Sequence, residues 1–378
     1  MMTLISTDGY VAEGFGKVAD AFAENFAERG DTGAACTVYV DGELVVDLWG
    51  GSTGSGPFTR NTRSVMFSVS KGITAVCLLM AAEEGMLELD APVAQYWPEF
   101  GAQGKTRLTV RQLLAHRAGL IAPDETMTVE ELRAWFPVTD ALARQEPLWQ
   151  PGTAFAYHAL TIGWLAGEVL RRTTGKRPSE WLRDRVAGPL GLSMTFGIGA
   201  SDADFAPLGE PLPSTPPAAV AIADLDLIER VMGMNGAFDG LDIFASANGP
   251  EFLSYEIPAG NLVSSAHDLA RVYAATVSDV DGIRLLRPDT IRDARLPVSA
   301  GAPFVGVDAG HRWGTGFMLN SATRQMAGEG SFGHDGAGGQ LGFARLEGEV
   351  ALGYQTLRPG GESDTRAEEL CRALRHCL

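Results

Sequence analysis

The chain of 378 residues has few cysteines, no long hydrophobic run and no basic leader. Its four cysteines, Cys36, Cys77, Cys371 and Cys377, show neither C-x-x-C nor Cys/His spacing, which argues against a disulfide framework and a structural zinc site. No stretch approaches the roughly 20 apolar residues of a membrane span, and the N-terminus lacks the features of a signal peptide. We therefore expect a cytoplasmic protein that uses no metal and no cofactor and does not contact a membrane.

Basic residues are in deficit, because 30 Lys and Arg face 47 Asp and Glu and give a formal net charge of −17. Nucleic acids and anionic membrane surfaces attract basic patches, so neither is an expected partner. Hydrophobic residues make up 45% of the chain, which is typical of a globular protein, and the length allows one large domain or two lobes. The expected partner is a small molecule, and the oligomeric state stays open.

The two ends of the chain carry similar strand and helix signals. An apolar stripe over residues 15–26 predicts an amphipathic helix, and residues 36–50 predict a hairpin about Asp41-Gly42. Residues 339–357 predict two further strands, and the capping-box pattern Thr365-x-x-Glu368 predicts a helix that runs to the terminus. The signals between these ends are mostly helical. We therefore expect the two ends to share one antiparallel sheet.

The stretch Gly50-Gly51-Ser52-Thr53-Gly54 matches the G-x-S-x-G pattern of α/β-hydrolase serines. A nucleophile of that kind sits on a tight turn between a strand and a helix. The residues that follow, SGPFTRNTRS, contain Gly, Pro and Asn and have no helical period. We therefore interpret Ser52 as part of a loop after a hairpin strand and not as a nucleophile.

A second serine pattern, Ser68-Val69-Ser70-Lys71, directly precedes an apolar run of helical length. Unpaired N–H groups and the positive end of the helix dipole favour a developing alkoxide there. Ser68 and Lys71 are three residues apart and share one helix face, whereas Ser70 points elsewhere and is assigned a packing or backbone-bonding role. Only Lys71, of the four lysines, has a serine three residues before it. As a base it would need its pKa to fall from about 10.4 toward 7, at a cost of ~4 kcal/mol.

Two later segments add candidate residues. Tyr157 stands in a loop just before a long predicted helix, and His334-Asp335-Gly336 opens a predicted strand, with glycines that let a ligand approach the backbone. Together, Ser68-x-x-Lys71, Tyr157 and His334-x-Gly336 resemble, in order, the motifs of the serine β-lactamase and penicillin-binding protein superfamily. The resemblance is closest to the class C β-lactamase-like branch that includes family VIII carboxylesterases, and LLAHRAGL, PGTAFAYHA and PAGNLVSSAHDLAR look like further segments of that branch.

The resemblance implies an α+β, β-lactamase/transpeptidase-like fold, in which an antiparallel sheet is flanked by helices and joined to a mainly helical lobe. We expect residues 1–66 and 297–378 to form the sheet lobe together, and residues 67–296 to form the helical lobe. The active site is expected at the interface between the two.

The resemblance also implies roles for individual residues. It assigns Ser68 as the acylated nucleophile and Lys71 with Tyr157 as the base machinery. The backbone N–H groups of Ser68 and Ala337 would form the oxyanion hole. On this basis the leading hypothesis is a serine hydrolase that cleaves small carboxylic esters.

Two departures from the family pattern bear on the substrate. The second box is usually Tyr-x-Asn, whose Asn binds an amide of the substrate, but here it is Tyr157-His158-Ala159. The late box is usually Lys-Thr-Gly, which holds a carboxylate, but here it is His334-Asp335-Gly336, and a neutral imidazole beside a carboxylate is a poor carboxylate receptor. Both losses favour simple esters over β-lactams and peptides. We expect His334, Gly336 and His158 to contact the substrate, and His158 has the capping of the next helix as its alternative role.

Several alternatives stay open. A Ser68–His334–Asp335 triad is disfavoured, because adjacent strand residues face opposite sides of the sheet, and His116 is assigned a structural role in a turn. An acyltransferase, or an amide hydrolase acting on β-lactams or D-amino peptides, would use the same acyl-enzyme. A binding module without activity is the least favoured reading, because it has no need of the intact motif residues.

Overall fold

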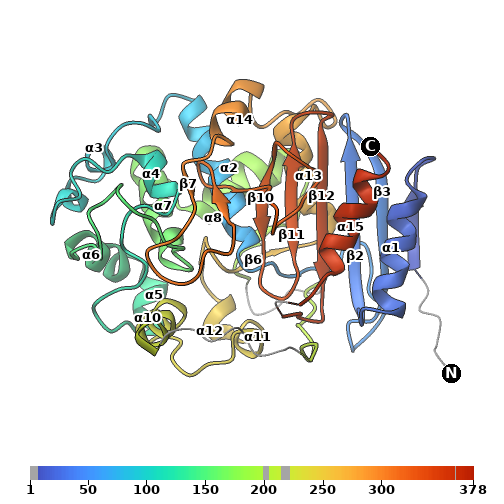
Figure 1. Cartoon of the computed structure of the whole chain (residues 1–378), viewed down its shortest axis with the longest axis horizontal. Helices are drawn as coiled ribbons and strands as arrows, with labels where there is room; N and C mark the ends of the chain where they lie inside the picture. Colours follow the sequence, from blue (N-terminus) through green and yellow to red (C-terminus); the bar gives the residue numbers. More distant parts are fainter. Residues whose placement is uncertain (1–6, 199–203, 214–221, 362) are drawn as a thin grey trace.

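The structure of the protein is a computed structural model that describes residues 7–198, 204–213, 222–361 and 363–378. Within these ranges the strands form a nine-stranded antiparallel sheet in the order β1-β3-β2-β12-β11-β10-β9-β8-β7, and a small sheet in the order β4-β6-β5. Most of the helices lie beside the large sheet, to the left in Figure 1. The α+β architecture expected from the sequence is confirmed.

The strands of the large sheet are β1 (Thr7–Val11), β2 (Gly33–Val40), β3 (Glu43–Gly51), β7 (Ser299–Ala300), β8 (Arg312–Trp313), β9 (Met318–Leu319), β10 (Ser331–Asp335), β11 (Leu341–Arg345) and β12 (Val350–Thr356). The strands of the small sheet are β4 (Ser64–Val65), β5 (Thr195–Phe196) and β6 (Leu262–Ser264).

The α-helices are α1 (Gly16–Ala27), α2 (Val69–Glu83), α3 (Val93–Tyr96), α4 (Val110–Leu114), α5 (Val129–Ala134), α6 (Phe136–Arg144), α7 (Thr161–Thr174), α8 (Pro178–Trp181), α9 (Gly188–Leu190), α10 (Ile222–Gly233), α11 (Ile243–Ser246), α12 (Pro250–Leu253), α13 (Ala266–Val277), α14 (Pro288–Ala294) and α15 (Arg366–Arg375). A 3-10 helix spans Pro98–Gly101, and a π-helix spans Leu182–Ala187. None of the helices in the described ranges is long and apolar enough to cross a bilayer.

Alternate residues of the strands face two separate cores. Val38 on β2 and Leu352 on β12 belong to the core beneath α1 and α15, whereas their neighbours Tyr39 and Ala351 belong to the core shared with α2 and α13. Successive residues of a strand point to opposite faces of the sheet. Helices α1 and α15 therefore cover one face of the sheet, and α2 and α13 cover the other (Figure 1).

The two ends of the chain meet in the middle of the large sheet. Strand β12 pairs with β2 in a register that joins Val350 to Val40 and Thr356 to Ala34. The expectation that both ends share one antiparallel sheet is thus confirmed. The division into residues 1–66 with 297–378, and 67–296, stays a prediction.

The C-terminal helix begins where the sequence predicts, but its capping residue differs. The Thr365 side chain makes no cap hydrogen bond. Asp364 Oδ1 instead accepts hydrogen bonds from the backbone N–H of Arg366 at 3.0 Å and from its Nε at 2.9 Å. Arg366 also forms a fully buried ion pair with Asp31 at 2.5 Å. The Asp364 carboxylate therefore satisfies an N–H group at the start of α15 and pairs with the Arg366 guanidinium at the same time.

Close packing of α13 on the sheet depends on two glycines. A Cβ at Gly353 on β12 would lie 2.3 Å from the Ala266 carbonyl oxygen, and a Cβ at Gly342 on β11 would lie 2.7 Å from the ring of Tyr273. Larger residues at these positions would push α13 off the sheet. Because α13 follows β6 closely in the chain, this contact also fixes the place of the small sheet.

Gly353→Val is expected to lower the free energy of unfolding by about 3 kcal/mol, because the new side chain collides with backbone that cannot move aside. Urea unfolding followed by circular dichroism measures the effect. Gly56→Ala is the matched control, since no atom lies within 4 Å of its added Cβ. An unchanged unfolding midpoint for Gly353→Val would contradict the packing described for α13.

Candidate active site

Ser68 lies on a tight turn between β4 and α2. Phe67 adopts a left-handed conformation with φ of 45°, which is uncommon for a residue other than glycine, and α2 begins one residue after Ser68. The N–H of Met66 donates to the Leu262 carbonyl at 2.8 Å and so ties the turn to β6. Ser68 therefore lies at the N-terminus of a helix, as the sequence predicts.

Ser70 has the structural role that the sequence assigns to it. Its hydroxyl donates to the Phe67 carbonyl and accepts a hydrogen bond from the Leu262 N–H at 2.9 Å. Both partners belong to the backbone, and one of them lies on β6. The Ser70 hydroxyl thus connects the turn at Phe67 to strand β6.

The Lys71 amine is buried beside Ser68. Its Nζ lies 3.0 Å from Ser68 Oγ and donates to the Ala259 carbonyl at 2.8 Å, and the residue is 5% exposed. Burial holds the pKa of Lys71 well below its usual value, and this effect outweighs the opposing effect of Asp335. A neutral amine in this position can accept the proton of the Ser68 hydroxyl.

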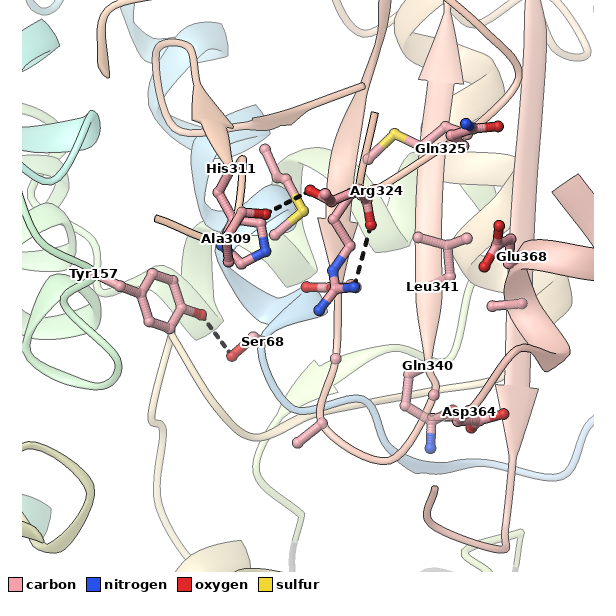
Figure 2. A pocket seen from close by; sticks show the side chains of 18 of the residues that line it. Ser68, Tyr157, Ala309, His311, Arg324, Gln325, Gln340, Leu341, Asp364 and Glu368 are labelled. Atoms are coloured by element: carbon pink, nitrogen blue, oxygen red, sulfur yellow. Dashed lines mark hydrogen bonds and ion pairs between the residues drawn. The ribbon is translucent and has the colours of Figure 1, made fainter. Parts of the chain in front are cut away.

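Tyr157 makes the second contact with Ser68. Its hydroxyl donates to Ser68 Oγ at 2.8 Å, as Figure 2 shows, and its ring stacks on Trp313 with 5.3 Å between the centroids. The Lys71 Nζ lies 4.8 Å from the centroid of the tyrosine ring. Burial raises the pKa of Tyr157, and the hydrogen bond to Ser68 offsets this only in part. The phenol therefore keeps its proton at neutral pH.

Two buried histidines hold the segment that carries Tyr157. The Nε2 of His158 accepts a hydrogen bond from the Leu120 N–H at 3.2 Å, and its Nδ1 lies 2.7 Å from the Ala156 carbonyl oxygen, which makes Nδ1 the protonated nitrogen. His116 Nδ1 accepts from the His158 N–H at 3.2 Å, so His116 is structural, as expected. The substrate contact expected of His158 is corrected here. Both of its ring nitrogens bond to backbone, and it lines neither cavity at Ser68.

The His334 side chain is buried and lines neither of the cavities at Ser68. The residue is 1% exposed, its Nδ1 lies 2.6 Å from the Asp335 carbonyl oxygen, and its Nε2 has no partner within the described residues. Burial lowers the pKa of His334, so the ring is neutral at neutral pH. The substrate contact expected of the His334 side chain is therefore also corrected, because its neighbour Asp335 lines the cavity and His334 does not.

The Ser68–His334–Asp335 triad is not formed. Within the described residues, Ser68 Oγ bonds to Lys71 and Tyr157 and not to His334. The reason given from the sequence needs correction, however, because the Asp335 carboxylate comes within 3.5 Å of His334 Nδ1 although the two residues are neighbours on β10. The contact that the triad lacks is the one between His334 and Ser68, whereas His334 and Asp335 do lie close together.

Gly336 brings the end of β10 against the turn of Ser68. A Cβ on Gly336 would lie 2.4 Å from the Met66 carbonyl oxygen, so the close approach requires glycine. From the sequence we expect a ligand to need this space, whereas it is the protein's own backbone that occupies it. Gly336 nevertheless lines a cavity at Ser68, and its contact with a substrate stays a prediction.

The backbone N–H groups of Ser68 and Ala337 have no hydrogen-bond acceptor among the described residues. Both residues line both of the cavities that meet at the site. Free N–H groups in such a place can stabilise an oxyanion. The geometry is therefore compatible with the oxyanion hole expected from the sequence.

Two cavities meet at Ser68, Tyr157 and Ala337. The first has a volume of about 610 Å³ and lies between residues 301–326, the β10–β11 connection and the start of α15. The second has a volume of about 740 Å³ and lies beneath α10 and α11. Its apolar lining includes Phe67, Leu160, Phe238, Leu241, Ile243 and Phe252. Within the described ranges no three His, Cys, Asp or Glu side chains converge as they would around a metal ion.

The sequence did not point to three residues of the first cavity. His311 and Trp313 belong to the segment HRWGTGF, whose mixture of aromatic and basic residues is the only signal they give. Arg324 lies in no motif, yet its Nε forms an ion pair with Asp335 Oδ2 at 3.0 Å. Burial raises the pKa of Asp335, but His334 and Arg324 outweigh it and lower the pKa overall. Asp335 is therefore charged at neutral pH.

Ser52 is a loop residue, as the sequence predicts. Its hydroxyl donates to the Gly56 carbonyl at 2.9 Å and accepts from the Gly54 N–H at 3.0 Å. The Ser52 side chain is exposed. The short loop after Ser52 turns back, so that Ser52 and Pro57 form an isolated antiparallel bridge. No helix begins there, so the arrangement of a nucleophile turn is missing.

The large antiparallel sheet, the helices on both of its faces and the serine–lysine–tyrosine cluster define the fold class of the serine β-lactamases and penicillin-binding proteins. Residues 18–374 match the protein family described as Beta-lactamase. The chain therefore belongs to the beta-lactamase family.

Individual relatives agree with this assignment. The chain is 32% identical over 358 residues to the Esterase/beta-lactamase LipL of Mycobacterium tuberculosis, which covers 89% of this chain and 80% of that protein. It is similar to the crystal structure of a family VIII carboxylesterase with a TM-score of 0.89 and 33% identity, over 99% of this chain and 100% of the other. The structure of EstA from Arthrobacter nitroguajacolicus Rue61a gives a TM-score of 0.87 and 32% identity over 98% of each chain. The resemblance seen in the motifs is thus confirmed.

Gly336→Ala is expected to lower kcat by about 100-fold, because an added Cβ 2.4 Å from the Met66 carbonyl oxygen displaces the turn that carries Ser68. Steady-state hydrolysis of 4-nitrophenyl butyrate measures the loss, and circular dichroism checks that the fold is kept. Gly209→Ala is the control, since its added Cβ meets no atom closer than 3.6 Å. Full activity of Gly336→Ala would contradict this close approach.

Proposed function

We propose that the protein hydrolyses small carboxylic esters through an acyl-enzyme on Ser68. The observation that supports this best is the place of Ser68 Oγ, which lies 3.0 Å from Lys71 Nζ and 2.8 Å from the Tyr157 hydroxyl. A serine hydroxyl is a weak nucleophile until a neighbouring base takes its proton. The names of the relatives, which include an esterase and a carboxylesterase, support the same chemistry.

In the first step the neutral Lys71 amine takes the proton of Ser68, and Oγ attacks the ester carbonyl carbon. The carbonyl oxygen becomes an oxyanion and accepts hydrogen bonds from the N–H groups of Ser68 and Ala337. Removal of one donor of this kind typically costs about 100- to 1,000-fold in kcat. Lys71 serves as the base because burial lowers its pKa, whereas burial raises the pKa of Tyr157.

In the second step the tetrahedral intermediate collapses and the bond to the alcohol oxygen breaks. Tyr157 donates its proton to this leaving oxygen. The Lys71 ammonium, whose nitrogen lies 4.8 Å from the centroid of the tyrosine ring, then returns a proton to the phenolate. The products of the acylation are the free alcohol and acylated Ser68, with Lys71 neutral again.

Water completes the cycle by the same groups in reverse. A water molecule attacks the acyl carbon and gives its proton to Tyr157, which passes its own phenolic proton to the neutral Lys71 amine. The oxyanion returns to the same N–H groups. When this intermediate collapses, Ser68 Oγ leaves and takes the proton from Lys71. The carboxylic acid is released and the resting site is restored.

Simple esters suit this site better than amides or β-lactams. Position 159 is an alanine and cannot bind a side-chain amide of a substrate, and the His334 side chain is buried and neutral. An alkoxide is also a better leaving group than an amide anion, so release of the alcohol from an ester depends less on proton donation than release of an amine does. These features support ester hydrolysis as the activity.

Ser68→Ala is expected to abolish turnover of 4-nitrophenyl butyrate, whereas Ser52→Ala leaves kcat/KM unchanged, because Ser52 bonds only within its own loop. Mass spectrometry of the wild-type protein during turnover is expected to find a butyryl group on the peptide that contains Ser68. Loss of activity in Ser52→Ala, or a wild-type protein that neither forms the adduct nor releases nitrophenol, would overturn the proposal.

The pH dependence of kcat/KM is expected to show an acid limb and then a plateau, because only neutral Lys71 accepts the proton of Ser68. Asp335 opposes the lowering of the Lys71 pKa, while His116 and His334 face the amine as neutral groups. Removal of the negative charge in Asp335→Asn therefore lowers the Lys71 pKa further and moves the acid limb to lower pH.

The matched control for this shift is Asp308→Asn, which removes a carboxylate that lines the same cavity and caps the Gly310 N–H at 2.8 Å. Its acid limb is expected to coincide with that of the wild type. A limb that moves to higher pH in Asp335→Asn would contradict the assignment of Lys71 as the base.

A further inference from the structure

Helix α11 lies between the two cavities that meet at Ser68. Ile243 and Ser246 are three positions apart and so share one face of this helix, and both line the second cavity. Phe244 belongs to the same helix but lines the first cavity. The two faces of one short helix thus border two different cavities, and α11 forms part of the wall between them.

The aromatic ring of Phe244 extends this wall toward the nucleophile. It packs edge to face on the ring of Phe67, with 5.7 Å between the centroids and 83° between the planes, and aromatic pairs favour this geometry. Phe67 directly precedes Ser68 in the chain and lines the second cavity, whereas Phe244 lines the first. The two rings therefore occupy the space between the cavities beside Ser68.

Hydrogen bonds on both sides of Phe244 hold α11 in place. The Asp242 carboxylate caps the helix, because it accepts hydrogen bonds from the N–H groups of Phe244 at 2.9 Å and Ala245 at 2.8 Å. After the helix, the Asn248 side-chain amide pairs with the backbone of Leu208. It accepts from the Leu208 N–H at 2.8 Å and donates to the Leu208 carbonyl at 2.9 Å. The helix that carries the Phe244 ring is therefore anchored at both ends.

The Phe244 ring also reaches the connection between β10 and β11. A Cβ on Gly338 would lie 3.3 Å from Cε1 of the ring, and Gly338 follows Ala337, whose N–H group is one of the two proposed oxyanion donors. The wall therefore extends from the turn of Ser68 to the segment of Ala337. A carbonyl group bound between the N–H groups of Ser68 and Ala337 would lie beside the two rings.

This wall limits the shape of an ester that can react. The acyl chain and the alcohol chain leave the reacting carbonyl in different directions, and Ser68 lines both cavities, so each chain can enter one of them. A second substituent on the carbon next to the ester group would need the space between the cavities. The rings of Phe67 and Phe244 occupy that space. The site therefore has room for longer chains but not for branches beside the ester bond.

We propose that Phe244 is a specificity-determining residue, which keeps the two cavities apart and rejects esters that are branched next to the ester group. This inference rests on the proposed function and names its substrate class, which is esters with unbranched carbons on both sides of the ester bond.

Two pairs of isomeric esters test the proposal on the two sides of the ester bond. 4-Nitrophenyl hexanoate and 4-nitrophenyl 2-ethylbutyrate differ only in the branching of the acyl group, and release of nitrophenol measures their hydrolysis. Propyl butyrate and isopropyl butyrate differ only in the branching of the alcohol, and pH-stat titration measures the acid released. The ratio of kcat/KM for the branched ester to that for the linear ester is compared between variants, so intrinsic reactivity cancels.

Phe244→Ala is expected to raise this ratio about tenfold in at least one pair, because loss of the ring makes room for the additional substituent. The kcat/KM of the linear ester is expected to stay within about threefold of wild type. Phe244→Leu keeps an apolar side chain without the ring and is expected to raise the ratio by a smaller factor, so it serves as a second variant if the alanine disturbs the fold.

Phe304→Ala is the matched control, since Phe304 is an exposed phenylalanine that lines neither cavity. Its ratios are expected to equal those of the wild type. Equal losses on both members of each pair in the Phe244 variants would show that the ring only supports the turn of Ser68. Ratios that are unchanged or lower would show that the ring does not exclude branched groups, so either result overturns the inference and leaves the proposed function intact. If the wild type hydrolyses none of the four esters, the proposed function fails and the inference fails with it.

Discussion

The amine of Lys71 lies in the interior, and its hydrogen bonds go to the Ser68 hydroxyl and the Ala259 carbonyl and not to a carboxylate. Helix α2 is buried from Val69 to Ala81, so a lysine on its first turn loses its hydration on folding. Because no opposite charge among the described residues is in contact with the amine, burial lowers the pKa of Lys71. A carboxylate in direct contact would restore the charge and remove the base. The surrounding elements must therefore exclude water from this amine and keep carboxylates out of contact with it.

Asp335 is the carboxylate that opposes the low pKa of Lys71, because its negative charge favours the ammonium form of the amine. Asp335 lines the first cavity, as Ser68 does. Two neighbours hold its charge in place, since Arg324 pairs with it at 3.0 Å and His334 Nδ1 lies 3.5 Å away. His334 stays neutral because burial lowers the pKa of its imidazole.

Features that depend on neighbours in the chain could be predicted from the sequence. Ser68 and Lys71 share one helical turn, and the apolar run after them locates the helix whose start carries the serine. The strands at both ends follow from turn residues and alternation. In contrast, the orientation of the His158 ring depends on a hydrogen bond from the backbone N–H of Leu120. Position 336 has to be glycine because a Cβ there would collide with the Met66 carbonyl oxygen. Periodicity predicts which face a side chain takes, but not which distant backbone atom it meets.

The same limit explains why the charge of the cavity could not be read from the late motif alone. The motif has a histidine at position 334, and the cation that pairs with Asp335 belongs to the loop between β9 and β10, as Arg324. The exchange has a chemical consequence, because a guanidinium does not lose its proton in a protein whereas a buried amine does. A second lysine near Ser68 could act as a base or share a proton with Lys71. Arg324 can do neither, so the charge beside Asp335 stays fixed, whereas the amine of Lys71 has its pKa lowered by burial.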